Sequence, residues 1–298
     1  MPQVKANGIT IEYETFGSSS DPTILLIMGL GMQLIAWPEP FCRELAANGF
    51  RVIRYDNRDT GFSTKFDDAK TPSVRSLMIR SLLRLPIRVP YTIRDMADDA
   101  IGLLDALCIA SAHIVGASMG GMIAQNLAAT YPEQVRSLTS VMSTSGHRSI
   151  PGADPLVSRH LFLSTPKQPD REAVIAHRAR TIELIGSPAY PIDEETRREM
   201  AAISFDRCYY PAGFARHVGA IIHDGDRRDR LRKIAAPTLV IHGREDPLVP
   251  LAGGIDTATH VPGARLEIIE GMGHNFPVEL WPTMIGLVSD HAKGSDAA

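Results

Sequence analysis

Short apolar runs alternate along this chain with segments in which apolar residues recur every three or four positions. The first pattern predicts buried strands and the second amphipathic helices, and their alternation is typical of a mostly parallel sheet with helices on both faces. Eight strands are predicted, near residues 4–6, 9–15, 24–28, 52–55, 113–115, 138–141, 238–242 and 266–269. The first two are expected to form an antiparallel hairpin. Helices are predicted near residues 40–48, 92–107, 119–130, 253–260 and 277–291.

The strand pattern stops between residues 147 and 230, where helical segments with proline-rich joints take over, including 171–185 and 194–202. This change predicts a helical cap over residues 147–230, inserted into a core made of residues 1–146 and 231–298.

A second, smaller insertion is predicted at residues 65–90. One helical stripe of apolar residues is interrupted there by arginines. This pattern predicts a basic amphipathic helix. A surface helix packed on the cap is the favoured interpretation, and weak contact with a lipid interface through residues 74–88 is the alternative. The apolar stripe comprises Val74, Leu77, Met78, Leu82 and Leu85, and the arginines are Arg75, Arg80, Arg84 and Arg88.

The candidate chemistry begins at Ser118, in the run Gly116-Ala117-Ser118-Met119-Gly120. An apolar strand-like segment precedes this Gly-x-Ser-x-Gly pattern and a helical run follows it, which is the context of a nucleophile elbow. A serine on such a sharp turn exposes its Oγ, and the turn tolerates only very small residues two positions away on either side, which Gly116 and Gly120 provide.

A serine hydroxyl needs a neutral imidazole as base and a carboxylate that fixes the imidazole tautomer. We predict His274 as the base, because it follows the last apolar strand in a glycine-rich loop. The other histidines are interpreted as structural or surface residues. We predict Asp246 as the acid, because it lies in a turn after the strand near 238–242, and neighbouring Glu245 is the rival.

The chain order Ser118, Asp246, His274 is the order of α/β-hydrolases. Together with the segment 52–61, the elbow and Gly271-Met272-Gly273-His274, it resembles the α/β-hydrolase superfamily, and within it the serine esterases of the aclacinomycin methylesterase kind. The resemblance spans about residues 9–290 and is weak in the cap. It implies the α/β-hydrolase fold, with an eight-stranded mostly parallel sheet, flanking helices and an inserted cap.

Acyl transfer also needs donors for the developing oxyanion. Met119 N–H is expected at the helix start, and the resemblance implies Leu30 N–H as the second donor, with Met28 standing where the commoner loop has histidine. The substrate is expected to contact Gly29, Leu30 and Met119. Three aromatic residues of the cap are further candidates for substrate binding: Phe205, Tyr209 and Phe214.

The composition argues against several other classes of protein. The 31 basic and 34 acidic side chains give a formal net charge of −3, which offers no electrostatic basis for nucleic-acid binding. No apolar run approaches the roughly 20 residues that span a bilayer, which predicts a soluble, cytoplasmic protein without a transmembrane segment. Three widely spaced cysteines, Cys42, Cys108 and Cys208, predict buried, unpaired thiols.

No cofactor or metal is expected. Gly29-Leu30-Gly31 lacks the third glycine of a dinucleotide fingerprint, and the acidic segment 56–61 is interpreted as a loop braced by Asp–Arg pairs. The sequence therefore predicts a cofactor-independent hydrolase for a moderately large, apolar, small-molecule ester. A perhydrolase, a carbon–carbon bond hydrolase, a thioesterase and a ligand-binding protein with little turnover remain alternatives, and a homodimer is left open.

Overall fold

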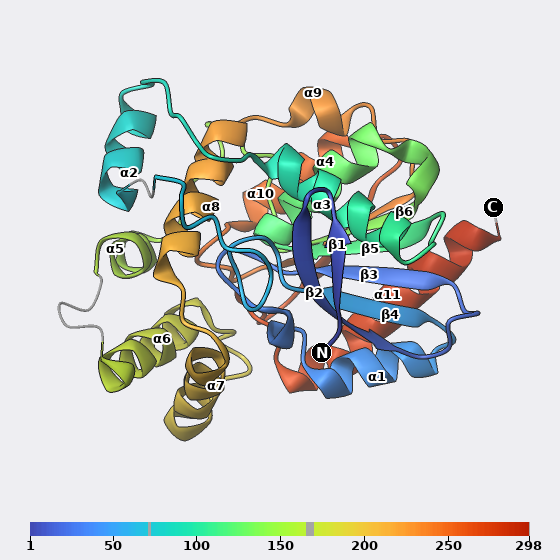
Figure 1. Cartoon of the computed structure of the whole chain (residues 1–298), viewed down its shortest axis with the longest axis horizontal. Helices are drawn as coiled ribbons and strands as arrows, with labels where there is room; N and C mark the ends of the chain where they lie inside the picture. The colour runs from blue at the N-terminus through green and yellow to red at the C-terminus, as the bar shows by residue number, and fades with distance from the viewer. Residues whose placement is uncertain (71–72, 165–169, 298) are drawn as a thin grey trace.

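The computed structural model describes residues 1–70, 73–164 and 170–297. Its centre is an eight-stranded sheet in the order β1-β2-β4-β3-β5-β6-β7-β8 (Figure 1). The pairs β1–β2 and β2–β4 are antiparallel, and every pair from β4 to β8 is parallel. The eight predicted strands and the N-terminal hairpin are confirmed. The strands are β1 Gln3–Ala6, β2 Ile9–Phe16, β3 Thr23–Ile27, β4 Arg51–Tyr55, β5 Ala112–Ala117, β6 Val135–Val141, β7 Thr238–Gly243 and β8 Arg265–Ile269.

Helices cover both faces of the sheet, because its central strands are apolar on both sides. One buried cluster joins the sheet to α3 (Ile93–Ala106) and α4 (Met119–Thr130). The other joins it to α1 (Glu39–Ala47) and α11 (Trp281–Asp296), which lie on the opposite side (Figure 1). On the described chain, none of the helices combines the length and apolarity needed to cross a membrane.

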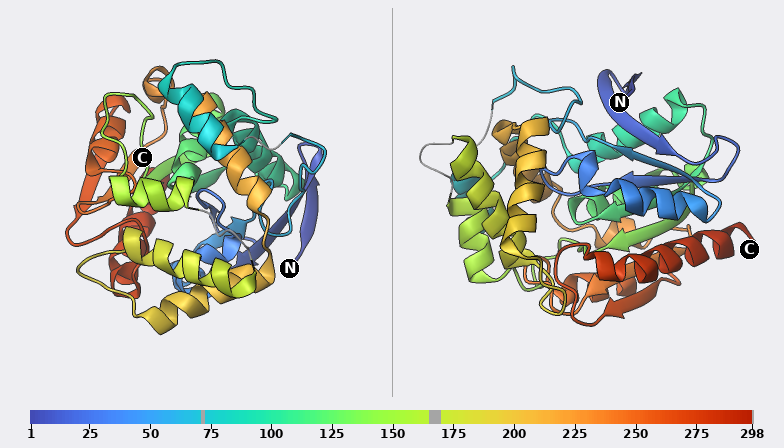
Figure 2. Two further views of the ribbon diagram at one scale, coloured as in Figure 1. Left: turned by 90° about the vertical axis from the view of Figure 1, so that its left-hand side faces the viewer. Right: turned by 90° about the horizontal axis from the view of Figure 1, so that it is seen from below.

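The chain between β6 and β7 is helical. Helices α5, α6 and α7 gather on one side of the molecule, and α6 packs against α7 (Figure 2). The helices of this stretch are α5 Pro155–Leu163, α6 Arg171–Ile185, α7 Glu194–Arg207, α8 Pro211–Asp224 and α9 Arg228–Leu231. The remaining elements are α2 Val74–Leu82, α10 Leu251–His260 and the 3₁₀ turns η1 Leu34–Ala36, η2 Pro132–Gln134 and η3 Val278–Leu280. The division into core and cap at residues 147 and 230 stays a prediction.

Helix α2 departs from the predicted amphipathic segment. It ends at Leu82, and Arg84 takes a positive φ of 55° that a continuing helix does not allow. The helix lies against α8 and α5, yet among its residues only Leu77 is buried. Met78, Leu82 and Leu85 are 39, 82 and 44% exposed. The prediction that one apolar stripe packs on the cap is therefore wrong for these three residues.

The elbow between β5 and α4 depends on two glycines. A Cβ on Gly116 would lie 2.2 Å from Gly120 O, and a Cβ on Gly120 would lie 2.1 Å from Ile27 O. Real Cβ atoms do not approach backbone oxygen so closely, so any side chain at either position would push α4 away from the sheet. The Gly-x-Ser-x-Gly pattern is therefore a packing requirement of the strand–helix contact.

Gly120→Ala is expected to lower the free energy of unfolding by about 1–3 kcal/mol, the usual cost of overpacking a rigid core. Gly286→Ala is the matched control, because Gly286 also lies in a helix but faces open space. That change should be neutral or stabilising by up to about 1 kcal/mol, since alanine is the better helix former. Urea unfolding followed by circular dichroism measures both. Equal stability of the two variants would contradict the packing requirement.

Candidate active site

Ser118 stands at the tip of the elbow. Its φ of 57° and ψ of −119° place a non-glycine residue in a strained conformation, which the surrounding packing holds. Ser118 N donates to Val141 O at 2.9 Å, and Gly29 lies so near that a Cβ there would be 3.0 Å from Ser118 Cβ. The side chain is only half-buried, so the hydroxyl remains accessible to a reactant.

His274 and Asp246 meet at the same edge of the sheet, in the loops that follow β8 and β7. His274 Nδ1 lies 2.7 Å from Asp246 Oδ2. The other carboxylate oxygen, Oδ1, accepts from Leu248 N at 2.9 Å and Val249 N at 2.8 Å. With the carboxylate so fixed, Nδ1 carries the proton that it donates, and Nε2 is left with its lone pair.

Glu245, the rival acid, is directed elsewhere. Its Oε2 accepts a hydrogen bond from Gly271 N at 2.7 Å, and its side chain is exposed. Glu245 therefore braces the glycine-rich loop that carries His274, whereas the structure brings Asp246 to the imidazole.

The three predicted side chains follow three strands of one parallel run: Ser118 follows β5, Asp246 follows β7 and His274 follows β8. Among the residues that the structure describes, neither Ser118 Oγ nor His274 Nε2 has a hydrogen-bond partner. In structures without substrate, catalytic hydrogen bonds are commonly long and tighten when a ligand binds. Among the described residues, the arrangement thus offers a hydroxyl and a ring nitrogen without partners at one sheet edge.

Two backbone donors stand beside the serine. In the part of the chain that is described, the N–H groups of Leu30 and Met119 have no acceptor. Met119 opens α4, so its N–H belongs to the unsatisfied first turn of that helix. The Leu30 loop is held from below by Asn57 Nδ2, which donates to Met28 O at 2.9 Å, and by Asp56 Oδ1, which accepts from Leu34 N at 2.7 Å.

His217 of α8 fixes the same loop from above, a role that sequence reasoning missed. Its Nδ1 accepts from Gly31 N at 3.2 Å, and its Nε2 donates to Arg58 O at 2.8 Å. The ring is fully buried, and burial lowers the pKa of His217 to about 4, so it is neutral at physiological pH. The His217 ring must be neutral here, because a protonated Nδ1 could not accept the hydrogen bond from Gly31 N–H.

The acidic segment 56–61 is braced by arginines, as predicted. Asp59 pairs with Arg216 of α8 at 2.7 Å, and Asp56 pairs with Arg207 of α7 at 2.8 Å. Burial opposes ionisation of Asp59, but hydrogen bonds from Arg216 and Tyr91 outweigh it, and the pKa of Asp59 falls below its usual range. These pairs attach the cap helices to the loop under the candidate oxyanion donors. Across the described ranges, no group of three or more His, Cys, Asp or Glu residues is arranged to hold a metal ion.

The predicted cap residues are placed differently from one another. Phe214 packs over the loop, so close that a Cβ on Gly31 would lie 2.9 Å from its ring. Phe205 and Tyr209 stack on each other with ring centroids 4.9 Å apart. A cavity of about 410 Å³ lies between α8 and the loop after β6. Its lining includes Met122, one turn beyond Ser118, but none of Ser118, Asp246 and His274 and none of these three aromatic residues.

The cysteines are unpaired, as predicted, but not uniformly buried. Cys42 is buried, Cys208 is half-buried and Cys108 is exposed. Cys108 has a positive φ of 56° at the turn that follows α3, and this position keeps it at the surface.

Comparison with known proteins shows the family and supports the fold. The profile of a family described as alpha/beta hydrolase fold matches residues 22–279. Rhodomycin D methylesterase DauP of Streptomyces sp. (strain C5) is 29% identical, and DnrP of Streptomyces peucetius is 28% identical; each comparison covers 96% of both chains. The meta-cleavage product hydrolase CumD of Pseudomonas fluorescens IP01 superposes with a TM-score of 0.77 over 99% of this chain and 98% of its own, at 21% identity.

His217→Ala is expected to lower kcat for an ester substrate by about 10- to 100-fold with little change in KM, because the loop loses its anchor while the pocket remains. His217→Asn should recover part of that loss, since its side-chain oxygen can accept from Gly31 N–H. His260→Gln, a histidine on α10 away from the site, is the control and should leave kcat unchanged.

The same residue contributes to the pH dependence of stability. His217 is neutral when folded but binds a proton below about pH 6.5 when unfolded, so acidification favours the unfolded chain. Between pH 7 and pH 5 this contribution amounts to about 2 kcal/mol. The difference in unfolding free energy between these two pH values should therefore be smaller in His217→Asn than in the natural chain. An unchanged difference, together with unchanged kcat, would refute the role of His217.

Proposed function

The chain belongs to the alpha/beta hydrolase fold family, and we propose that it is a cofactor-independent serine hydrolase that cleaves carboxylic esters. The observation that carries the proposal is the 2.7 Å hydrogen bond between His274 Nδ1 and Asp246 Oδ2, at the sheet edge where the elbow exposes Ser118. This combination supplies a nucleophile, an oriented base and a fixed acid.

In the proposed reaction, Ser118 Oγ forms a bond to the ester carbonyl carbon while His274 Nε2 takes the hydroxyl proton. The N–H groups of Leu30 and Met119 hold the oxyanion, and Asp246 stabilises the imidazolium. When the carbon–oxygen bond to the alcohol breaks, Nε2 returns the proton to the leaving oxygen. The acyl group is then an ester of Ser118.

Hydrolysis of this acyl-enzyme repeats the sequence with water. Water loses a proton to Nε2 as its oxygen bonds to the carbonyl carbon, the same two amides hold the charge, and Ser118 Oγ leaves with the proton. The acid is released and the enzyme is restored. No step requires a metal, an oxidant or a reductant.

We propose a methyl ester of a moderately large, apolar acid as the substrate. The similarity to two rhodomycin D methylesterases over nearly the whole chain supports the ester class. A cavity of about 410 Å³, lined in part by Met122, Ile221 and Ile222, falls in the size range of small-molecule sites, and the proposal requires that it communicate with Ser118, which does not line it.

A cytoplasmic location is part of the proposal. All three cysteines are free thiols, and unpaired cysteines are typical of reducing compartments. An exposed thiol such as Cys108 would be prone to oxidation elsewhere.

Ser118→Ala is expected to lower kcat for methyl and p-nitrophenyl esters by about 10⁴- to 10⁶-fold, because no other group replaces the nucleophile. Hydrolysis in ¹⁸O-labelled water should place the label in the acid product and none in the alcohol, as acyl transfer requires. Initial rates and mass spectrometry of the products provide the two readouts.

Thermal unfolding serves as the control, since the half-buried Ser118 side chain contributes little packing. Near-normal ester turnover by a folded Ser118→Ala variant would overturn the proposal. So would a natural chain that cleaves carbon–carbon bonds of 1,5-diketones but leaves every ester intact.

Asp246→Asn is expected to reduce kcat by about 10³- to 10⁴-fold, because the amide favours the wrong imidazole tautomer. Glu245→Gln is the matched neighbour. Its side-chain oxygen can still accept from Gly271 N–H, so its kcat should stay within a few-fold of the natural chain. A larger loss in Glu245→Gln than in Asp246→Asn would reverse the assignment of the acid.

A further inference from the structure

A concentration of exposed apolar side chains lies at the end of α2. No other segment of similar length in the described chain exposes as many large apolar residues. Met78, Ile79, Leu82 and Leu83 occupy positions i, i+1, i+4 and i+5, which form one broad face of the helix and its end. We call the following residues the α2 patch: Met78 (39% exposed), Ile79 (49%), Leu82 (82%), Leu83 (60%) and Leu85 (44%).

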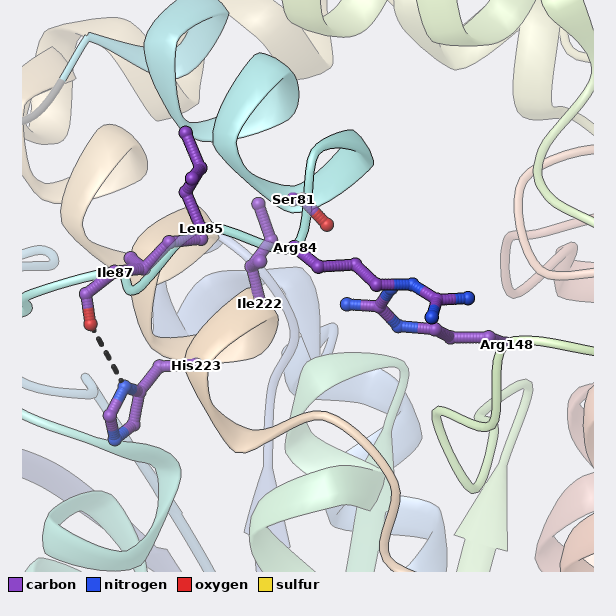
Figure 3. Close-up of a pocket in the computed structure, with 7 residues that line it drawn as sticks. All are labelled: Ser81, Arg84, Leu85, Ile87, Arg148, Ile222 and His223. Carbon is purple, nitrogen blue, oxygen red and sulfur yellow. Dashed lines mark hydrogen bonds between the residues drawn. The ribbon is translucent and has the colours of Figure 1, made fainter.

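The charge around the α2 patch is of one sign. Residues 73–90 contain four arginines and neither aspartate nor glutamate. Arg75 and Arg88 are exposed, and no carboxylate in the described part of the chain pairs with them. Arg84 extends toward Arg148 from the opposite wall of a small cavity, again without a carboxylate between them among the described residues (Figure 3).

The packing of α2 does not account for this surface. The helix uses Leu77 to contact the rest of the protein and lies along α8 and α5, at the outer side of the molecule (Figures 1 and 2). A group of exposed apolar side chains this close together indicates a surface that a membrane or another molecule covers.

We propose that the α2 patch docks onto the surface of a membrane leaflet that contains anionic lipid. Apolar residues flanked by arginines match the two layers of such a surface, because the side chains enter the acyl boundary while the guanidinium groups meet phosphates. A second copy of this chain fits less well. A twofold interface would bring together two copies of a patch that carries arginines and no carboxylate in residues 73–90.

The α2 patch lies beside two cavities that share lining residues. The cavity between Arg84 and Arg148 has a volume of about 170 Å³ and is lined on the α2 side by Ser81, Arg84 and Leu85 (Figure 3). It shares Ser81, Arg148 and Ile222 with the cavity of about 410 Å³ that reaches Met122 near the elbow. A docked molecule would therefore hold the outer end of this cavity system at the lipid surface.

Flotation of the full chain with vesicles tests the proposal. The protein should float with vesicles of phosphatidylcholine and phosphatidylglycerol, more weakly with phosphatidylcholine alone, and less as salt screens the arginines. Leu82→Ser with Leu83→Ser should lower the partition coefficient by about tenfold or more. Arg75→Gln with Arg88→Gln should lower it by about fivefold for each arginine on the anionic vesicles.

Matched controls carry the same changes on other faces. Ile255→Ser with Val278→Ser removes two exposed apolar side chains, and Arg43→Gln with Arg265→Gln removes two exposed arginines. Both controls should float like the natural chain. Hydrolysis of a water-soluble ester should be equal in all of these variants, which separates the docking surface from the proposed chemistry.

Three results would overturn the proposal: no flotation with anionic vesicles, equal loss in patch and control variants, or a dimer in light scattering that Leu82→Ser with Leu83→Ser dissociates while vesicles bind neither form. The last result would assign the α2 patch to a second copy of the chain.

Discussion

The close approach of α4 to the sheet is the constraint on which the rest of the site depends. Gly116 contacts Gly120 and Gly120 contacts Ile27 O at distances that leave no room for a Cβ. Because strand and helix meet there, the chain must turn sharply at Ser118, and the turn leaves both its hydroxyl and the first N–H of α4 at the sheet edge. A packing condition between two backbone segments thereby positions the proposed nucleophile and one of the two proposed oxyanion donors together.

The loop that carries Leu30 is held by residues of α7 and α8. His217 holds Gly31 N–H, while Arg216 and Arg207 hold Asp59 and Asp56 in the loop beneath. Each of these arginine and histidine side chains is buried or nearly so, which makes the contacts sensitive to small displacements of α7 and α8. The geometry of the proposed Leu30 donor is therefore linked to the positions of these two helices.

The sequence predicted the sheet well because buried parallel strands are continuous apolar runs, and it predicted the elbow because all its requirements lie within a few residues. Asp246 and His274 followed from strand ends that meet at one edge. The role of His217 could not be predicted from strand ends, because its hydrogen-bond partners Gly31 and Arg58 lie 186 and 159 residues away in the chain. The exposure of the apolar residues of α2 could not be predicted from the sequence either. Periodicity shows that a helix has an apolar face, but it does not show which neighbour covers that face. The apolar content of the segment suggested Phe205 and Tyr209 as substrate contacts; their rings stack on each other, and their role in substrate binding stays a prediction.

The proposed chemistry requires that Ser118 and His274 reach one carbonyl group whose oxygen two main-chain amides bind. A crystal structure of the enzyme after reaction with an alkyl phosphonate fluoride measures it most directly. Phosphorus should be bonded to Ser118 Oγ, a phosphonyl oxygen should lie within about 3 Å of both Leu30 N and Met119 N, and His274 Nε2 should be hydrogen-bonded to the adduct. Phosphorus on another residue, or a phosphonyl oxygen remote from both amides, would contradict it.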